Sequence, residues 1–304
     1  MMNKSEFSVV IPTHNRKALL LRAIRSVIEQ QEAVQIIVVD DASEDQTNEA
    51  VEQMMQTYPN IMYLRNDMSL FAHGSRKKGY QYVQGKYVVF MDDDDYYTDP
   101  TFFRSAKAVL DEHQNVSAVI GRTFVTKNGK YIPGPELCGE GLIENREYFN
   151  GFLTKYPKPN SSLSAVFRKT ALDTSGLEQS LMFDDTCIYL NGLLHGDTYL
   201  IGREVAAYYV HSMNISHRRL PRDFMLDTMN EKVRIYKAAK EMQLLDHPRD
   251  WAYRQFTDSA MFFLETSGKD VRLIPFFLAW WIINGQGTQF RFIGWIIKKI
   301  LHIK

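Results

Sequence analysis

Cysteine is scarce in this sequence of 304 residues. Its only two cysteines, Cys138 and Cys187, lie far apart, with neither a CxxC motif nor Cys/His spacing around them. That usage excludes a framework of disulfides and offers no zinc site. It is typical of a protein in a reducing compartment, and we expect a cytoplasmic location.

The sequence also lacks a long hydrophobic run near its start and an excess of either charge. The apolar run Phe7–Ile11 is too short for the core of a signal peptide. The 36 Lys and Arg residues are balanced by 36 Asp and Glu residues, so no general basic surface for nucleic acid is expected. The length favours one α/β domain with an appendage, and two small domains are the alternative.

Short β-rich runs alternate with helical patterns over the first 120 or so residues, which indicates a parallel sheet covered by helices. The predicted strands are Ser8–Ile11, Gln35–Val39, Ile61–Leu64, Tyr87–Met91 and Ala118–Ile120. The predicted helices are Arg16–Gln30, Thr47–Tyr58, Gly74–Val83 and Pro100–Glu112. We interpret this part as the nucleotide-binding half of an α/β domain.

The alternation of strand and helix patterns changes after residue 120. Glycine and proline between Gly121 and Gly141 predict a hairpin and a loop over the site. Two further strands, Leu163–Phe167 and Ala206–Val210, are expected around a helix at Thr186–Leu194, and the pattern is mainly helical after residue 218. We therefore expect a catalytic domain over residues 1–217, with halves at about 1–120 and 121–217, and a helical region over residues 218–304.

Strand ends are the places to search for chemistry, because ligands of open α/β sheets bind beyond the carboxyl ends of the strands. The first strand runs into Pro12-Thr13-His14-Asn15-Arg16, which lacks the glycine fingerprint of a dinucleotide-dependent dehydrogenase. The second runs into Asp40–Asp45, where an acid can accept hydrogen bonds from a ribose or a base. A helix cap in a solvated turn explains the same residues equally well.

The fourth strand gives the strongest signal, since it runs straight into Asp92-Asp93-Asp94-Asp95. Four adjacent carboxylates repel one another unless a cation lies among them. Hard divalent ions such as Mg²⁺ or Mn²⁺ take oxygen ligands and can bridge to a diphosphate. A helix cap would account for one of these carboxylates but not for four.

Two further motifs have weaker signals on their own. The basic stretch His73–Lys78 places Gly74 where a helix N-terminus could cradle phosphate oxygens and Arg76 where it could clamp them. Its two lysines are equally consistent with a solvated helix face. The pair Asp184-Asp185 opens a predicted helix, where acids are common because of the helix dipole.

Taken in order, four motifs make a more specific pattern than any one of them. They are Val9–Arg16, Val38–Asp45, Val89–Asp95 and Phe183–Asp185. With this pattern the chain resembles the inverting glycosyltransferases of family 2 over roughly residues 6–212. The resemblance implies the GT-A fold, a Rossmann-like and mostly parallel central sheet with helices on both faces, followed here by the C-terminal helical region.

The resemblance also implies roles for individual residues. The donor nucleotide would be bound by Pro12, Thr13, Asn15, Asp40, Asp41, Arg76, Asp92 and Asp93. The metal ligands would be Asp94, Asp92 and His211, although a lone histidine at a strand end is otherwise more often structural. Asp185 would be the general base with Asp184 as its helper, and the chain's Asp-Asp in place of the more frequent Glu-Asp leaves open which of the two is the base.

The function implied is metal-dependent transfer of a sugar from a UDP-sugar, with Mn²⁺ or Mg²⁺, to a hydroxyl of a glycan or lipid-linked glycan acceptor. Synthesis of bacterial surface polysaccharide is the expected setting. A nucleotidyltransferase is one alternative, although the segment after the first strand lacks its glycine-rich loop. A non-catalytic sugar-nucleotide-binding scaffold is another, although it would not need both acidic motifs.

Residues 271–304 contain no acid and five basic residues, Arg272, Arg291, Lys298, Lys299 and Lys304. The apolar run Leu273–Ile283 is too short to span a bilayer, which needs ~20 residues. A final helix would carry Ile293, Ile296, Ile297, Ile300 and Leu301 on one face, near Trp280, Trp281 and Trp295. Such a face predicts an interfacial membrane helix at the inner face of the membrane. Docking against the catalytic domain or a second copy of the chain is the alternative.

Overall fold

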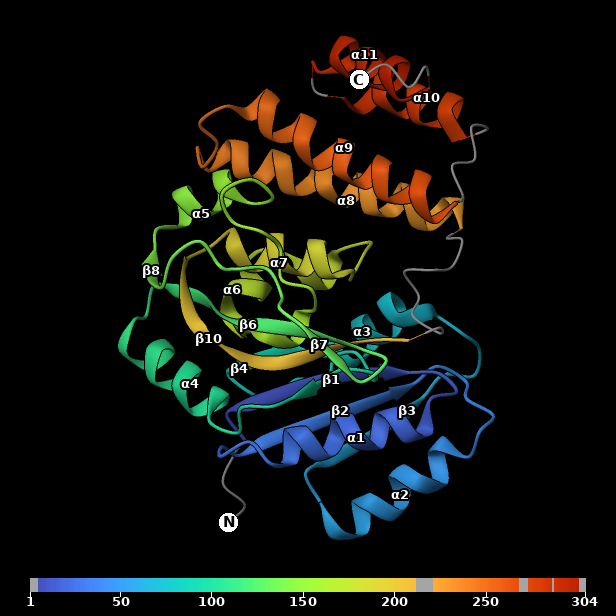
Figure 1. Ribbon diagram of the computed structural model, residues 1–304, viewed down its shortest axis with the longest axis vertical. Helices are drawn as coiled ribbons and strands as arrows, with labels where there is room; N and C mark the ends of the chain where they lie inside the picture. The colour runs from blue at the N-terminus through green and yellow to red at the C-terminus, as the bar shows by residue number, and fades with distance from the viewer. Residues whose placement is uncertain (1–4, 212–220, 268–272, 286, 301–304) are drawn as a thin grey trace.

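The computed structural model describes residues 5–211, 221–267, 273–285 and 287–300, and the side chains of these up to residue 295 (Figure 1). Its strands are β1 Phe7–Thr13, β2 Val34–Asp40, β3 Ile61–Arg65, β4 Tyr87–Phe90, β5 Tyr96–Tyr97, β6 Val116–Lys127, β7 Lys130–Ile132, β8 Gly141–Ile143, β9 Ala165–Arg168 and β10 Asp197–Val210. Its helices are α1 Lys17–Ile28, α2 Thr47–Thr57, α3 Phe71–Tyr80, α4 Phe102–Glu112, α5 Asn145–Gly151, α6 Lys169–Thr174, α7 Asp185–Leu193, α8 Arg222–Glu241, α9 Pro248–Thr266, α10 Ile274–Asn284 and α11 Gln289–Ile300.

One sheet organises the structure, with its strands in the order β3-β2-β1-β4-β9-β6-β10-β5. The first four are parallel neighbours, whereas β9 runs antiparallel between β4 and β6. The chain builds outward from β1 to β3 and then returns to the other side of β1 for β4. This reversal leaves a crevice beyond the carboxyl ends of β1 and β4, which is where open α/β sheets bind ligands.

Helices cover both faces of the sheet because both faces of its central strands are apolar. Along β1, Phe7, Val9 and Ile11 pack with α1 and α4 on one face, whereas Val10 packs with α3 on the other. The period of two is that of a strand, and burial on both faces is typical of parallel sheets. The predicted fold class, α/β of the GT-A type with added C-terminal helices, is confirmed (Figure 1).

The C-terminal helices extend the core that lies on the α3 side of the sheet. Trp251 of α9 stacks on Phe149 of α5, with ring centroids 5.2 Å apart. Trp280 and Trp281 of α10 are 5% and 1% exposed and pack on Phe256 of α9. The prediction that these two tryptophans lie at a membrane interface is therefore wrong, since they are core residues. Among the described residues, no helix is both long and apolar enough to cross a membrane.

The predicted alternation of strands and helices over the first 120 residues is confirmed, and so is the hairpin that follows it. β6 and β7 meet at Asn128-Gly129, where both residues have positive φ, the combination that a two-residue turn of type I′ requires. β6 and β10 are much longer than predicted because they pair with each other along most of their length. The predicted domain division at residue 218 lies outside the described residues and stays a prediction.

Gly79 of α3 allows this helix to approach the sheet closely. A Cβ atom at this position would lie 2.5 Å from Val10 Cγ1 and 3.0 Å from Val39 Cγ2. We expect Gly79→Ala to lower the free energy of unfolding by about 1–3 kcal/mol, because overpacking outweighs the gain in helix propensity. Gly294→Ala in α11 is the control, since nothing lies within 4 Å of its Cβ position. Urea denaturation of both variants measures the difference, and equal stability would contradict this account of the close approach.

Candidate active site

The ends of β1 and β4 meet in a cluster of charged side chains. Thr13, the last residue of β1, donates a hydrogen bond from Oγ1 to Asp93 Oδ2 at 2.7 Å. Arg16, just before α1, places Nη1 at 3.0 Å from Asp93 Oδ1 and 2.9 Å from Asp94 Oδ2. Arg16 is not among the residues predicted for the site, although its place three residues after β1 puts it beside the same crevice.

Three of the four consecutive aspartates point to a common centre. One ligand oxygen from each of Asp92, Asp94 and Asp95 lies within 4.8 Å of the other two. Asp95 is fully buried, and its Oδ1 accepts a hydrogen bond from Tyr209 N at 2.9 Å. Its Oδ2 has no hydrogen-bond partner in the part of the chain that the structure describes.

Burial makes ionisation of this cluster costly in the absence of a cation. It raises the pKa of Asp93 to about 7, against the attraction of Arg16. Burial also raises the pKa of Asp95 well above its usual range, and the neighbouring Asp94 and Asp92 raise it further. These carboxylates fit a hard divalent cation by their oxygen chemistry and their spacing.

His211 lies beside the cluster, at the end of β10. Its Nε2 is 2.9 Å from Asp94 Oδ2. The structure thus brings His211 together with Asp92 and Asp94, the other residues predicted to hold a metal. Asp95, which is not among the predicted metal ligands, joins them in the structure.

Arg76 of α3 joins this cluster to the later acidic pair. Its guanidinium is buried, with Nη2 at 2.5 Å from Asp92 Oδ1 and Nη1 at 3.0 Å from Asp185 Oδ1. Nη1 also donates to Phe183 O at 3.1 Å. Burial would lower the pKa of Arg76, but Asp92 and Asp185 raise it overall, so the side chain is a permanent cation.

The two members of the acidic pair have different surroundings. Asp184 caps α7, accepting hydrogen bonds from Cys187 N at 2.8 Å and from Thr228 Oγ1 at 3.2 Å. Asp185 points instead to Arg76. Burial opposes ionisation of Asp185, but Arg76, and after it Lys158, bring its pKa below the usual value.

Asp41 organises the loop between β3 and α3. Its carboxylate accepts hydrogen bonds from Asn66 Nδ2 at 2.8 Å, Ser69 Oγ at 2.5 Å, Leu70 N at 2.7 Å and Ser75 Oγ at 3.1 Å. Burial works against ionisation, and the hydrogen bonds from Ser69 and Leu70 bring the pKa of Asp41 below its usual value. The carboxylate is therefore occupied by the protein itself.

Asp40 and Asn15 likewise accept hydrogen bonds from residues of the neighbouring loops and strands. Asp40 accepts hydrogen bonds from Ser43 N at 2.8 Å, from Arg65 at 3.3 Å and from the Tyr63 hydroxyl. Asn15 has a φ of 53° and accepts a hydrogen bond from Glu44 N at 2.7 Å. The predicted nucleotide residues at the ends of β1 and β2 thus form one connected rim beside the acidic cluster.

The predicted phosphate cradle at Gly74 is wrong. α3 begins at Phe71, so Gly74 lies inside the helix and its N–H is not at a helix terminus. A Cβ atom at Gly74 would lie 2.7 Å from Leu70 Cβ, which gives this glycine a packing role instead. The helix starts earlier than predicted because Asp41 fixes Ser69 and Leu70 just ahead of it.

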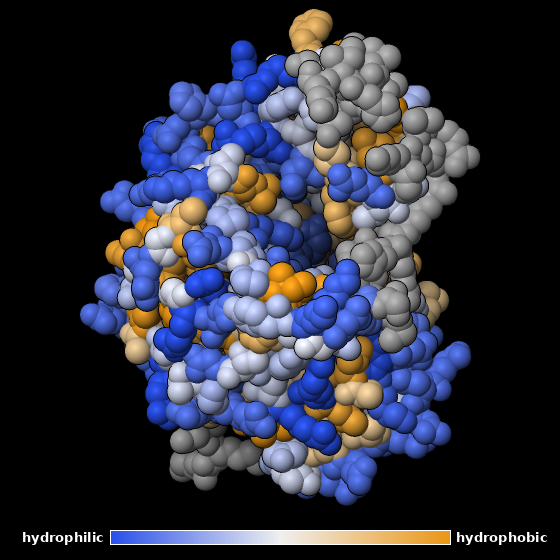
Figure 2. Space-filling model, viewed as in Figure 1, coloured by the Kyte–Doolittle hydropathy of each residue, from blue (hydrophilic) through white to orange (hydrophobic). Residues whose placement is uncertain are grey.

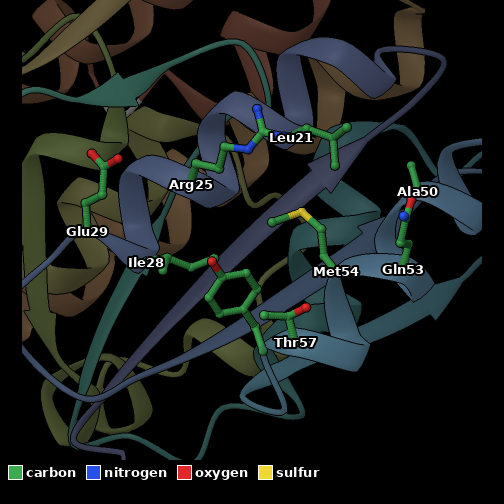
Figure 3. A pocket seen from close by; sticks show the side chains of 9 residues that line it. Leu21, Arg25, Ile28, Glu29, Ala50, Gln53, Met54 and Thr57 are labelled. Atoms are coloured by element: carbon green, nitrogen blue, oxygen red, sulfur yellow. The ribbon is translucent and has the colours of Figure 1, made fainter.

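A separate groove of about 500 Å³ lies between α1 and α2 (Figure 3). Its lining mixes apolar side chains such as Leu21 and Met54 with single charges from Arg25 and Glu29. None of the predicted site residues lines it. The surface is also hollowed between the C-terminal helices and the sheet, at the middle of the face in Figure 2.

The chain is similar to known proteins, both in sequence and in fold. The family described as "Glycosyl transferase family 2" matches residues 8–174, more than half of the chain. GalNAc(5)-diNAcBac-PP-undecaprenol beta-1,3-glucosyltransferase from Campylobacter jejuni is 28% identical over 191 residues, which are 61% of this chain and 59% of that protein. Minor teichoic acid biosynthesis protein GgaB from Bacillus subtilis is 27% identical over 189 residues, 60% of this chain but 19% of that protein. The chain therefore spans less than two thirds of either relative.

Solved structures have the same fold at lower identity. The structure of residues 1–349 of Staphylococcus aureus TarS in complex with UDP-GlcNAc has a TM-score of 0.69 and 19% identity, and covers 90% of this chain and 79% of that one. Mannosyltransferase PcManGT from Pyrobaculum calidifontis, in complex with GDP-Man and Mn²⁺, has a TM-score of 0.54 and 16% identity over 99% of this chain and 81% of that one. From the match over residues 8–174, the chain belongs to glycosyltransferase family 2.

Proposed function

We propose that this protein is an inverting, metal-dependent glycosyltransferase that transfers a sugar from a UDP-sugar to an acceptor hydroxyl. The proposal rests on the two ion pairs of Arg76. They join Asp92, a member of the aspartate cluster that fits a cation, to the separate, ionised carboxylate of Asp185. Two acidic centres with different ionisation fit a reaction that needs a cation at the leaving group and a base at the nucleophile.

On the donor side, we assign the diphosphate to the crevice between β1 and β4. Asp92, Asp94 and Asp95 would hold Mn²⁺ or Mg²⁺, with His211 beside them at Asp94. When bound, the ion would neutralise the charge that develops on the leaving nucleoside diphosphate. Asp93 is bound by Thr13 and Arg16, so its proposed role is to orient the ends of the two strands.

The uridine would bind along the rim formed by Pro12, Thr13, Asn15, Asp40 and Asp41. Because both aspartates already accept several hydrogen bonds, we propose that Asp40 and Asp41 shape this rim rather than bind the base with free oxygens. Arg76 would then be available to a phosphate oxygen when the donor displaces part of its ion pairing.

On the acceptor side, we assign Asp185 as the general base and Asp184 as the residue that positions it. Asp185 is ionised, so it can accept the proton of the attacking hydroxyl as that oxygen bonds to the anomeric carbon. Attack opposite the leaving diphosphate inverts the configuration at that carbon. Asp184 fixes the start of α7 through its cap and through Thr228 of α8.

The setting proposed is assembly of a bacterial surface polysaccharide on the cytoplasmic side of the cell membrane. Relatives named for minor teichoic acid synthesis and for an undecaprenol-linked acceptor support it. A glycan or lipid-linked glycan is the acceptor that we propose, and peripheral contact with the membrane fits that acceptor.

The nucleotidyltransferase alternative predicts release of pyrophosphate instead of UDP, so identification of the released product distinguishes the two enzyme classes.

Asp185→Asn should lower kcat by about 10²–10⁴-fold, because general-base catalysis contributes that much to typical rates. Donor binding should stay close to that of the wild type. Asp184→Asn is the matched variant, since asparagine caps helices as well as aspartate does and should keep most of the activity. UDP release during transfer measures both. A fall in kcat for Asp184→Asn alone would move the base to Asp184.

Mn²⁺ should raise the thermal stability of the wild-type protein even without nucleotide, because it relieves repulsion among buried carboxylates. At a hundred times the Kd, binding adds about 2.7 kcal/mol to the free energy of unfolding. Asp94→Asn should weaken this stabilisation, and EDTA should abolish it. Asp246→Asn, which removes an exposed carboxylate paired with Arg146, serves as control. An equal response of Asp94→Asn and the wild type would remove Asp94 from the ligand set.

A further inference from the structure

Large apolar side chains are exposed where α10 ends and α11 begins. Ile282 is 66% exposed, Ile283 is 79% exposed and Phe290 is 90% exposed. We call these three residues the apolar tip. The two helices approach each other there, since Gln289 Nε2 donates to Ile282 O at 3.4 Å. In Figure 2, apolar colour reaches the surface at the top of the molecule, over these helices.

The apolar tip lies on helices that are themselves firmly packed. Trp281 stacks on Phe292 of α11, with ring centroids 3.6 Å apart, and its Nε1 donates to Thr288 at 2.8 Å. Trp280 Nε1 donates to Asn230 of α8 at 3.0 Å. The core therefore holds α10 and α11 in place and leaves the tip residues outside it. Neighbouring exposed apolar residues of this size mark an interaction site more often than isolated ones do.

A basic groove of about 850 Å³ adjoins the tip, with Gly287, Thr288 and Arg291 in its lining. Its basic side chains are Lys240, His247, Arg249 and Arg291, and its acids are Asp246 and Asp250. Both acids are neutralised, Asp246 by Arg146 and Asp250 by Arg291. Among the described residues, Lys240 and Arg249 have no carboxylate partner, so the groove carries unbalanced positive charge.

The groove is shaped by the turn between α10 and α11. Gly287 has a φ of +83°, and a Cβ atom there would lie 3.2 Å from Arg249 Nε. Glycine thus lets the turn run close to the guanidinium. Apolar and basic groups consequently meet at one end of the molecule.

Charge complementarity indicates what this end binds. The chain as a whole has 36 basic and 36 acidic residues, yet residues 271–304 contain five basic residues and no acid. A symmetric dimer through this end would bring like charges together, which costs free energy. An anionic bilayer instead offers hydrocarbon for the tip and phosphate headgroups for the groove.

We propose that the apolar tip and the basic groove form a docking surface for an anionic lipid bilayer. The tip would enter the boundary between headgroups and acyl chains, and Lys240 and Arg249 would face the headgroup phosphates. Its use in catalysis rests on the proposed function. α8 receives Trp280 at Asn230 and binds Asp184 through Thr228, so the docking surface and the proposed base share one supporting helix.

Flotation of the full-length chain with vesicles tests the proposal without requiring catalysis. The probes are vesicles of phosphatidylcholine alone and of phosphatidylcholine mixed with phosphatidylglycerol. The wild type should float with the mixed vesicles only. The triple variant Ile282→Ser, Ile283→Ser, Phe290→Ser should lose at least about tenfold in partition, and Lys240→Gln with Arg249→Gln about fivefold for each cation removed.

Substitution is preferable to deletion of residues 271–304, because deletion would expose the core around Trp280 and Trp281. The matched control is Tyr82→Ser with Leu142→Ser, which removes apolar side chains that are 42% and 48% exposed elsewhere on the protein. This control should float like the wild type. UDP-sugar hydrolysis should be the same in all of these variants, so a failure of the proposed activity would be seen separately.

Three results would overturn the proposal. The first is a wild type that stays with the soluble fraction in the presence of the mixed vesicles, and the second is a triple variant that floats as well as the wild type does. The third is sedimentation showing a dimer that the triple variant dissociates, with flotation unchanged, which would assign the tip to a second copy of the chain.

Discussion

The ion pairs of Arg76 are the interaction on which the site depends. A buried guanidinium is stable only with carboxylates around it, and the buried carboxylates of this site need a cation in return. Because Arg76 contacts both Asp92 and Asp185, the loop after β4 and the start of α7 are fixed relative to each other through α3. Each of the three charges lowers the cost of burying the other two, and Arg76 keeps one carboxylate partner when the other is neutralised.

Because Arg76 must reach both carboxylates, the position and the first residue of α3 are closely constrained. The helix must lie close to β1 to bring Arg76 to the strand ends, and Gly79 permits the approach. Its start must be fixed too, and Asp41 accomplishes this by accepting hydrogen bonds from Ser69 and Leu70. An acid that the sequence presents as a ligand-binding residue is therefore also a structural one, at the beginning of the helix that carries Arg76.

The sequence was sufficient for those parts of the site that follow from local patterns. The strand that runs into Asp92–Asp95, and the acidic pair at the start of α7, could be located from hydrophobic periodicity and residue type. Contacts between distant segments could not be located in this way, because the spacing of residues along the sequence does not show which helix faces which strand end. The pairing of Arg16 with Asp93 and Asp94 is such a contact. The burial of Trp280 was missed for the same reason, since an amphipathic pattern does not reveal what the apolar face packs against.

The C-terminal helix α8 contacts the residues of the site directly and supports α7. Thr228 binds Asp184, and three residues further along α8 the buried Glu231 accepts from Asn191 of α7 at 3.3 Å and pairs with Arg234 at 2.6 Å. These contacts lie one helical turn apart on α8, as the spacing of residues on one helix face requires. α7 is thus held from both sides, by Arg76 at its acidic start and by α8 along its length. Trp280 of α10 contacts Asn230 of α8, and Thr228 of the same helix contacts Asp184, so side-chain contacts connect the far end of the molecule with the proposed acceptor side of the site.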